Sequence, residues 1–110
     1  LLWENASPSS NFANQTVNVD CSAYRTARIR FAAKVGSSQN IWQDIPVGSN
    51  CLCIVGYYPS AGFTVVTRLA TVATTSISFG KDLGKIFTST ETTINGTAEY
   101  MIPMEIYGIK

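Results

Sequence analysis

The feature that most constrains the fold of this chain is the alternation of apolar and polar residues in short runs, broken by Gly, Ser, Thr and Asn. A period of two places successive side chains on opposite faces of a β-strand. The clearest run is residues 27–35. Its apolar side holds Ala27, Ile29, Phe31, Ala33 and Val35, and its basic side holds Arg28, Arg30 and Lys34. This predicts a sheet with one wet face, on which the cations are a solvated stripe that resists aggregation or, alternatively, an anion-binding site.

Similar runs recur along the chain at spacings of about 8–12 residues, with turn-forming clusters between them. No long segment shows the apolar period of a helix. The chain is therefore expected to be all-β, with residues 1–110 forming a single β-sandwich or jelly-roll-like domain of roughly seven to nine antiparallel strands. An immunoglobulin-like or fibronectin-like adhesion domain is an alternative, although the Cys and Trp spacing of antibody domains is missing.

Four local patterns make sharper predictions. Residues 51–58 form a near-continuous apolar run, which is typical of a strand covered on both faces. Residues 58–62 resemble a hairpin link to the next strand. Asn95-Gly96 is the strongest two-residue hairpin signal in the chain. Pro103 cannot donate to a ladder hydrogen bond, so it should limit the last strand to a sheet edge or to a strand start.

Charge is scarce in this chain. Only 14% of the residues are charged, well below the roughly 25% of soluble domains, so part of the surface is expected to be hidden in a partner or in other copies of the chain. The net charge of +1 offers no electrostatic attraction for nucleic acid or a membrane surface. No apolar stretch approaches the roughly 20 residues of a membrane span. We therefore expect neither nucleic-acid binding nor membrane insertion.

The three cysteines, Cys21, Cys51 and Cys53, are an odd set without CxxC spacing. At most one intramolecular disulfide is available to them, which does not resemble a secreted disulfide scaffold. On a strand, Cys51 and Cys53 would point to the same face. We expect all three to be small buried residues, and we expect no metal ion or other cofactor.

Catalysis is not expected. The chain has no histidine, which is the commonest general base, so its hydroxyl and thiol side chains lack their usual activating partner. Asp20, Asp44, Asp82 and Glu105 each lie beside a predicted turn or strand end. Carboxylates at such positions commonly serve local hydrogen bonding. The sequence therefore predicts a binding or assembly module and not an enzyme.

Three aromatic residues are the candidate ligand-binding residues: Trp42, Tyr57 and Tyr58, which flank predicted loops. Aromatic planes stack on the apolar C–H faces of sugar rings, while amides and hydroxyls bind the sugar hydroxyls. Asn40 and Gln43 flank Trp42 and are candidates for those polar contacts. The competing interpretation is that these aromatics pack in the core or between the sheets, as they commonly do in small β domains.

Two stretches resemble small domains of phage and prophage tail proteins of Gram-positive bacteria. Residues 2–8, with Phe12, residues 15–17 and residues 21–24, are similar to their recurrent "LW-N-SP-S-F-QTV-D-S-Y" opening. Residues 102–110 resemble their "IP-IYGIK" ending, and residues 45–48 and 67–69 also fit. The likeness spans nearly the whole chain, its motifs are structural, and Cys21 departs from the apolar residue more usual there.

The resemblance implies the C-terminal, distal module of a longer tail-fibre or tail-tip protein. The implied location is the virion tail, after synthesis in the host bacterial cytoplasm. Such modules are often trimeric, and some are receptor-binding heads that recognise bacterial surface polysaccharide. The expected function is therefore a non-catalytic, receptor-binding module for a cell-surface glycan. The alternative is a structural module that trimerises or caps a tail fibre without a ligand. An aromatic-lined surface groove would favour the first, and a wholly polar outer surface the second.

Overall fold

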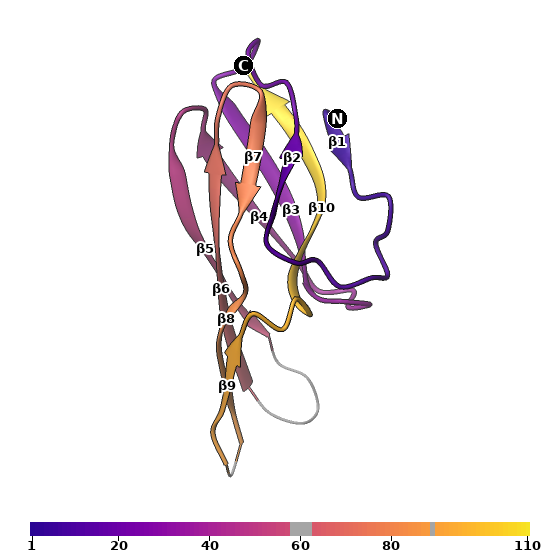
Figure 1. Ribbon diagram of the computed structural model, residues 1–110, viewed down its shortest axis with the longest axis vertical. Helices are drawn as coiled ribbons and strands as arrows, with labels where there is room; N and C mark the ends of the chain where they lie inside the picture. Colours follow the sequence, from indigo (N-terminus) through magenta and orange to yellow (C-terminus); the bar gives the residue numbers. More distant parts are fainter. Residues whose placement is uncertain (58–62, 89) are drawn as a thin grey trace.

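The computed structural model describes residues 1–57, 63–88 and 90–110, which form ten β-strands (Figure 1). The strands are β1 (Trp3–Glu4), β2 (Gln15–Asn18), β3 (Thr26–Lys34), β4 (Asn40–Pro46), β5 (Asn50–Tyr57), β6 (Phe63–Val72), β7 (Ser76–Phe79), β8 (Leu83–Phe87), β9 (Thr92–Asn95) and β10 (Tyr100–Ile109). The predicted all-β sandwich is confirmed. The strand number lies just above the predicted range because strands as short as β1 carry no visible periodicity. Within the described ranges, no helix is long and apolar enough to cross a lipid bilayer.

The strands form two antiparallel sheets. The four-stranded sheet has the order β1-β10-β3-β4. The six-stranded sheet has the order β2-β7-β6-β8-β9, and β5 pairs with the free side of β6. Both β7 and β8 pair with β6, β7 near its end and β8 near its beginning. The β8–β9 hairpin projects beyond the end of the four-stranded sheet, so the molecule is elongated at 48 × 23 × 20 Å (Figure 1).

The core lies between the sheets and is built from alternate residues of each strand. In β3, Ala27, Ile29, Phe31 and Ala33 are all buried, whereas Arg28 is exposed. The alternation predicted for this strand is therefore confirmed. Burial of these inward faces from water supplies the main driving force for closing the two sheets on each other.

A buried ion pair lies within this core. Arg68 on β6 and Asp82, just before β8, are both fully buried, with 3.9 Å between Arg68 Nη2 and Asp82 Oδ1. Arg68 also donates hydrogen bonds to the carbonyl oxygens of Gly80 (2.9 Å) and Tyr100 (2.8 Å), and its guanidinium lies 5.7 Å from the ring centre of Phe12. Because Tyr100 begins β10, this arginine joins the six-stranded sheet to the four-stranded sheet.

Asp82 holds the crossover into β10. Its carboxylate accepts hydrogen bonds from the Thr97 hydroxyl (2.7 Å) and from the backbone N–H groups of Ala98 (2.8 Å) and Tyr100 (3.2 Å). Ala98 has a φ of 65°, in the left-handed region that costs an L-residue energy. Asp82 was expected to form local hydrogen bonds beside a turn. It does accept such bonds, but its carboxylate is buried in the core and is also the counter-ion of Arg68.

The Asn95-Gly96 pair does not form the predicted two-residue hairpin. Strand β9 pairs with β8, whereas β10, which follows, belongs to the other sheet. Gly96 does adopt a positive φ of 72°, and its N–H donates to the Asp82 carbonyl oxygen (2.7 Å). Turn residues specify the local backbone path, but they do not specify the partner of the strand that follows.

The expectation that Pro103 limits the last strand to an edge or a strand start is also wrong. Strand β10 lies between β1 and β3, and Pro103 is within it. The register of β10 against β3 shifts between Pro103 and Glu105. Met104 is the extra residue of this bulge, and Pro103 itself stays opposite Phe31. In the described residues β1 pairs with β10 only at Glu105 and Ile106, and the Pro103 carbonyl oxygen accepts a hydrogen bond from the Asn5 side chain (2.9 Å). The β1 side of β10 therefore has no paired strand at Pro103, so the missing N–H removes no ladder hydrogen bond there.

Strand β5 lies at the edge of its sheet, and the described residues cover only its inner face. Cys53 and Val55 point inward and are buried, but Leu52 and Ile54 point outward and are 60% and 59% exposed. The prediction of a strand covered on both faces is therefore wrong for the single chain. The predicted hairpin link at residues 58–62 lies outside the described residues. The strands before and after it, β5 and β6, pair antiparallel.

Candidate functional site

The candidate site lies on the outer face of the four-stranded sheet, where the register aligns two rows of side chains across β4, β3 and β10. Arg28 pairs with Asp44 on one side and with Tyr107 on the other. One step along, Arg30 pairs with Trp42 and with Glu105. The outward residues of three strands thus form a compact grid, because side chains directly opposite on adjacent strands lie about 5 Å apart.

Both arginines are neutralised by carboxylates on this face. Arg28 binds Asp44 through two hydrogen bonds, from Nε to Oδ1 (2.8 Å) and from Nη2 to Oδ2 (2.9 Å). Arg30 donates from Nε to Glu105 (2.7 Å) and from Nη1 to the side-chain oxygen of Asn40 (2.9 Å). Two of the three cations of the predicted basic stripe are therefore in ion pairs, and the third, Lys34, lies 5.3 Å from the ring centre of Tyr100. An anion-binding role at Arg28 and Arg30 loses its electrostatic basis.

The pKa values of these groups follow from the same contacts. Hydrogen bonding to Asp44 raises the pKa of Arg28, and the same bonds lower the pKa of Asp44. The hydrogen bond from Arg30 lowers the pKa of Glu105, and the hydroxyl of Tyr107 adds to that effect. That hydroxyl donates to Glu105 (3.0 Å), which raises the pKa of Tyr107. At neutral pH, the face therefore carries charged pairs beside a neutral phenol.

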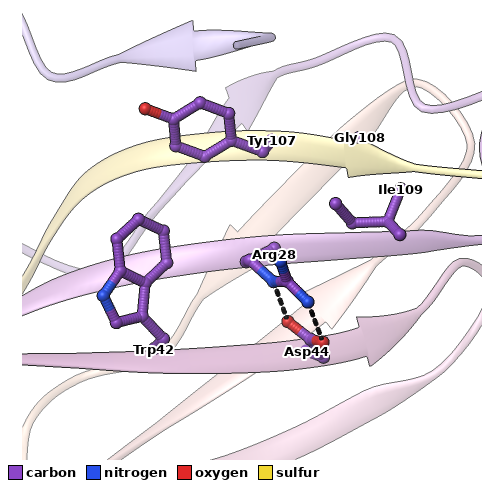
Figure 2. Close-up of a pocket in the computed structure, with 6 residues that line it drawn as sticks. All are labelled: Arg28, Trp42, Asp44, Tyr107, Gly108 and Ile109. Carbon is purple, nitrogen blue, oxygen red and sulfur yellow. Dashed lines mark hydrogen bonds and ion pairs between the residues drawn. The ribbon is translucent and has the colours of Figure 1, made fainter.

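Two aromatic rings lie side by side on this grid. The ring centres of Trp42 and Tyr107 are 5.9 Å apart and their planes meet at 39°. Trp42 is 53% exposed. With Arg28, Asp44, Gly108 and Ile109 they line a surface groove of about 560 Å³. Figure 2 shows the rings of Trp42 and Tyr107 next to each other, on β4 and β10, with the Arg28–Asp44 pair beside Trp42.

Gly108 allows the floor of the groove to pack closely. A Cβ at this position would come within 2.5 Å of the ring of Tyr24. The register pairs Gly108 with the buried Ala27, so this contact is on the inner side of β10. Tyr24 thus supports the groove from inside the sandwich, while Tyr107 faces out.

Of the three predicted binding residues, the structure places only Trp42 in this groove. Tyr57 ends β5 in the other sheet, is half-buried and packs against the core. Tyr58 lies outside the described residues. Asn40 shares the outer face with Trp42, whereas Gln43 pairs with the buried Ile29 and points to the opposite face.

Sequence analysis missed Tyr107, Arg28 and Asp44 as members of the site. The alternation of Glu105, Tyr107 and Ile109 was visible, but nothing in it shows that β10 lies beside β3. Asp44 and Glu105 were expected beside turns or strand ends, and both instead lie within strands, opposite arginines. Ion pairs between strands far apart in sequence appear only once the sheet order is known.

The cysteines lie away from this face. Cys21 and Cys53 are buried, Cys51 is half-buried, and all three are free thiols. Burial raises the pKa of Cys21, and burial together with Cys51 raises the pKa of Cys53 to about 12. Because the thiolate is the reactive form, these two buried thiols are inert at neutral pH.

The groove combines two aromatic planes with an adjacent guanidinium and carboxylate. Within residues 1–57, 63–88 and 90–110, no three potential metal-ligand side chains gather in one place. No protein-family model, curated protein or solved structure matches the chain.

Proposed function

We propose that this chain is a non-catalytic, receptor-binding module of a phage tail, and that it holds a bacterial cell-surface glycan in the Trp42–Tyr107 groove. The observation that carries the proposal is an aromatic-lined groove on an otherwise polar face. This is the feature that separates a receptor-binding head from a purely structural module, in which the outer surface would be polar throughout.

The aromatic rings suit the apolar face of a sugar ring. Trp42 has a large exposed π-surface, and Tyr107 extends it across β3. The Tyr107 hydroxyl is held by Glu105, so this ring is fixed before a ligand arrives. Binding to a preformed surface loses less conformational entropy than binding that has to order side chains.

The polar groups beside the rings suit sugar hydroxyls. Arg28 uses Nε and Nη2 on Asp44, and within the described part of the chain its Nη1 has no hydrogen-bond partner. Each carboxylate oxygen of Asp44 keeps acceptor capacity after one hydrogen bond. A sugar hydroxyl, which both donates and accepts, matches a neighbouring guanidinium and carboxylate better than an anion or a cation would.

A shallow site of this size binds weakly, and the proposal therefore includes several copies on one tail. Linked sites bind a repeating polysaccharide at high effective concentration, so a trimer would gain avidity without any further contact. The location implied by this proposal is the virion tail.

The direct test is binding of the labelled protein to whole Gram-positive cells, with half of each sample stripped of wall polysaccharide. We expect strain-selective binding that is lost on stripping. Trp42→Ala and Tyr107→Ala should each weaken binding about fivefold or more, since losing one stacking contact removes on the order of 1 kcal/mol.

The matched control is Leu1→Ala, which removes another exposed apolar side chain outside the groove and should bind like the parent protein. Circular dichroism would verify that all variants keep the β fold. Strain-selective binding that survives both groove substitutions would place the receptor site elsewhere. Absence of binding to every strain would favour the structural module.

A further inference from the structure

The exposed apolar residues of this protein are concentrated on one surface. Eight large hydrophobic side chains are exposed in the described part of the chain, and six of them belong to β5, β6 and β8. These six are Leu52, Ile54, Phe63, Leu69, Leu83 and Phe87, and we refer to them as the apolar face. The remaining two are Leu1 and Trp42. Scattered exposed hydrophobics need no explanation, but a contiguous set marks an interaction surface.

The register shows that these side chains share one side of the six-stranded sheet. Leu52 on β5 pairs directly with Leu69 on β6, and Phe63 on β6 pairs with Phe87 on β8. Thr67 lies between Ile54 and Leu83. The residues that alternate with them along the strands, such as Cys53 and Val66, point inward and are buried in the core. The apolar face is thus the outer surface of the sandwich.

This face is hollowed and nearly free of charge. A groove of about 600 Å³ lies over it, with Val65, Leu83 and Phe87 in its lining. Among the outward residues of β5, β6 and β8, only Lys85 is charged, and it forms an ion pair with Glu91. Nothing on the face would select a partner of opposite charge. By contrast, the outer face of the four-stranded sheet carries two arginine–carboxylate pairs.

The sequence pattern of β5 points to a missing cover. A near-continuous apolar run is typical of a strand buried on both faces, yet in the described part of the chain Leu52 and Ile54 on the outer face of β5 remain about 60% exposed. With roughly 200 Å² for a fully exposed large side chain and about half of each exposed, the apolar face amounts to on the order of 600 Å². A standard interface buries about 800 Å² per partner, which this face approaches once the residues between the six are included.

We infer that the apolar face packs against the same face of a second copy of this chain. An uncharged apolar surface is complementary to itself, and two sheet faces stack about 10 Å apart with interdigitating side chains. In a dimer the face would meet its one counterpart, and in a trimer it would be shared between two neighbours. The inference stands apart from the proposed function, because the glycan groove is on the other sheet and stays open in either arrangement.

The test is the oligomeric state of the purified protein, measured by light scattering after size exclusion and by sedimentation over a wide concentration range. We expect a dimer or trimer for the parent protein. Leu52→Lys combined with Ile54→Lys should be monomeric, with association weakened by on the order of 100-fold or more, because two apolar contacts are lost and two charges would be buried. Both side chains point outward, so the double variant should keep its circular dichroism spectrum. Its melting temperature should be lower than that of the parent protein and independent of protein concentration, because association stabilises the folded chain by mass action.

Trp42→Lys is the matched control, since it places a lysine at a similarly exposed apolar position on the other sheet. It should associate like the parent protein. A monomeric parent protein overturns the inference. So does an oligomer that survives the double substitution, or one that Trp42→Lys dissociates to the same extent. Binding to cells tests the proposed function separately. The Leu52→Lys, Ile54→Lys double variant should bind less tightly, because it loses avidity, but should keep its selectivity for unstripped cells.

Discussion

At the residue scale, the most consequential side chains are Arg68 and Asp82. Burial raises the pKa of the Asp82 carboxyl, but hydrogen bonds from Thr97, Ala98 and Tyr100, together with Arg68, outweigh this and leave the pKa lowered. Burial lowers the pKa of Arg68, and Asp82 opposes that shift. A charged pair in the core is weak evidence for net stability, but its two members depend on each other strongly.

Asp82→Asn should therefore be severely destabilising. The substitution keeps the shape of the side chain but leaves the charge of Arg68 uncompensated, and it removes an acceptor from the crossover into β10. Breaking a buried pair in this way costs about 3–5 kcal/mol, which denaturant unfolding would measure. Asp20→Asn is the control, because Asp20 is exposed and its carboxylate accepts hydrogen bonds from Ser22 alone among the described residues. This variant should unfold like the parent protein. If the two variants unfold at the same denaturant concentration, the Arg68–Asp82 pair does not hold the sheets together.

At the scale of elements, the contact between β6 and β8 depends on one glycine. A Cβ at Gly84 would lie 1.9 Å from the carbonyl oxygen of Val65 and 2.8 Å from the Cα of Val66. Both atoms are backbone, so no side-chain rotation relieves the overlap. The projecting β8–β9 hairpin therefore stays attached to the six-stranded sheet only with glycine at this position.

Gly84→Ala is expected to detach or shift β8, at a cost of about 1–3 kcal/mol or more. Hydrogen exchange should show faster exchange of backbone amides in β8 and β9, while β3 and β4 stay protected. Gly80→Ala is the matched control, because its Cβ would meet Leu69 at an ordinary 3.5 Å, and it should change neither exchange nor stability much. Unaltered protection of β8 and β9 in Gly84→Ala would contradict the close approach.

The order of the strands within each sheet could not be predicted from local sequence patterns. The strand predicted over residues 27–35 was visible from its alternation, but its partners were not. Pro103 and Asn95-Gly96 illustrate the reason. Both are local signals, whereas their outcome depended on a short β1 beside β10 and on a crossover between the sheets. Pairing between distant strands depends on side-chain packing across the whole core, which no single window of sequence contains.

At the scale of the whole molecule, the stability of the fold should be insensitive to pH over a broad range. The chain has no histidine, so the side chain that usually titrates between pH 5 and 8 is absent. The pKa values of Asp20, Asp44, Asp82 and Glu105 are all lowered by folding. Such carboxylates stabilise the fold above their unfolded pKa values, about 4, and lose that contribution as the pH falls through the folded values.

The melting temperature should therefore be nearly flat from roughly pH 8 to pH 5 and should fall below about pH 4. Thermal unfolding followed by circular dichroism would measure this. The Asp82→Asn variant, if it folds, should lose stability less steeply below about pH 4, since one of the four carboxylates is gone. A marked loss of stability between pH 8 and pH 6 would contradict the assignment of these carboxylates as the groups that set the acid limit.

The sequence by itself determined the all-β class and the inward and outward faces of β3, because period-two alternation is a local property of the chain. The tertiary structure alone decided that Trp42 is exposed beside Tyr107, that Asp44 and Glu105 neutralise Arg28 and Arg30, and that Arg68 is buried. It also decided that the apolar run of β5 has one face uncovered. Each of these depends on which distant strands become neighbours, and that choice is made by burial and pairing over the whole molecule.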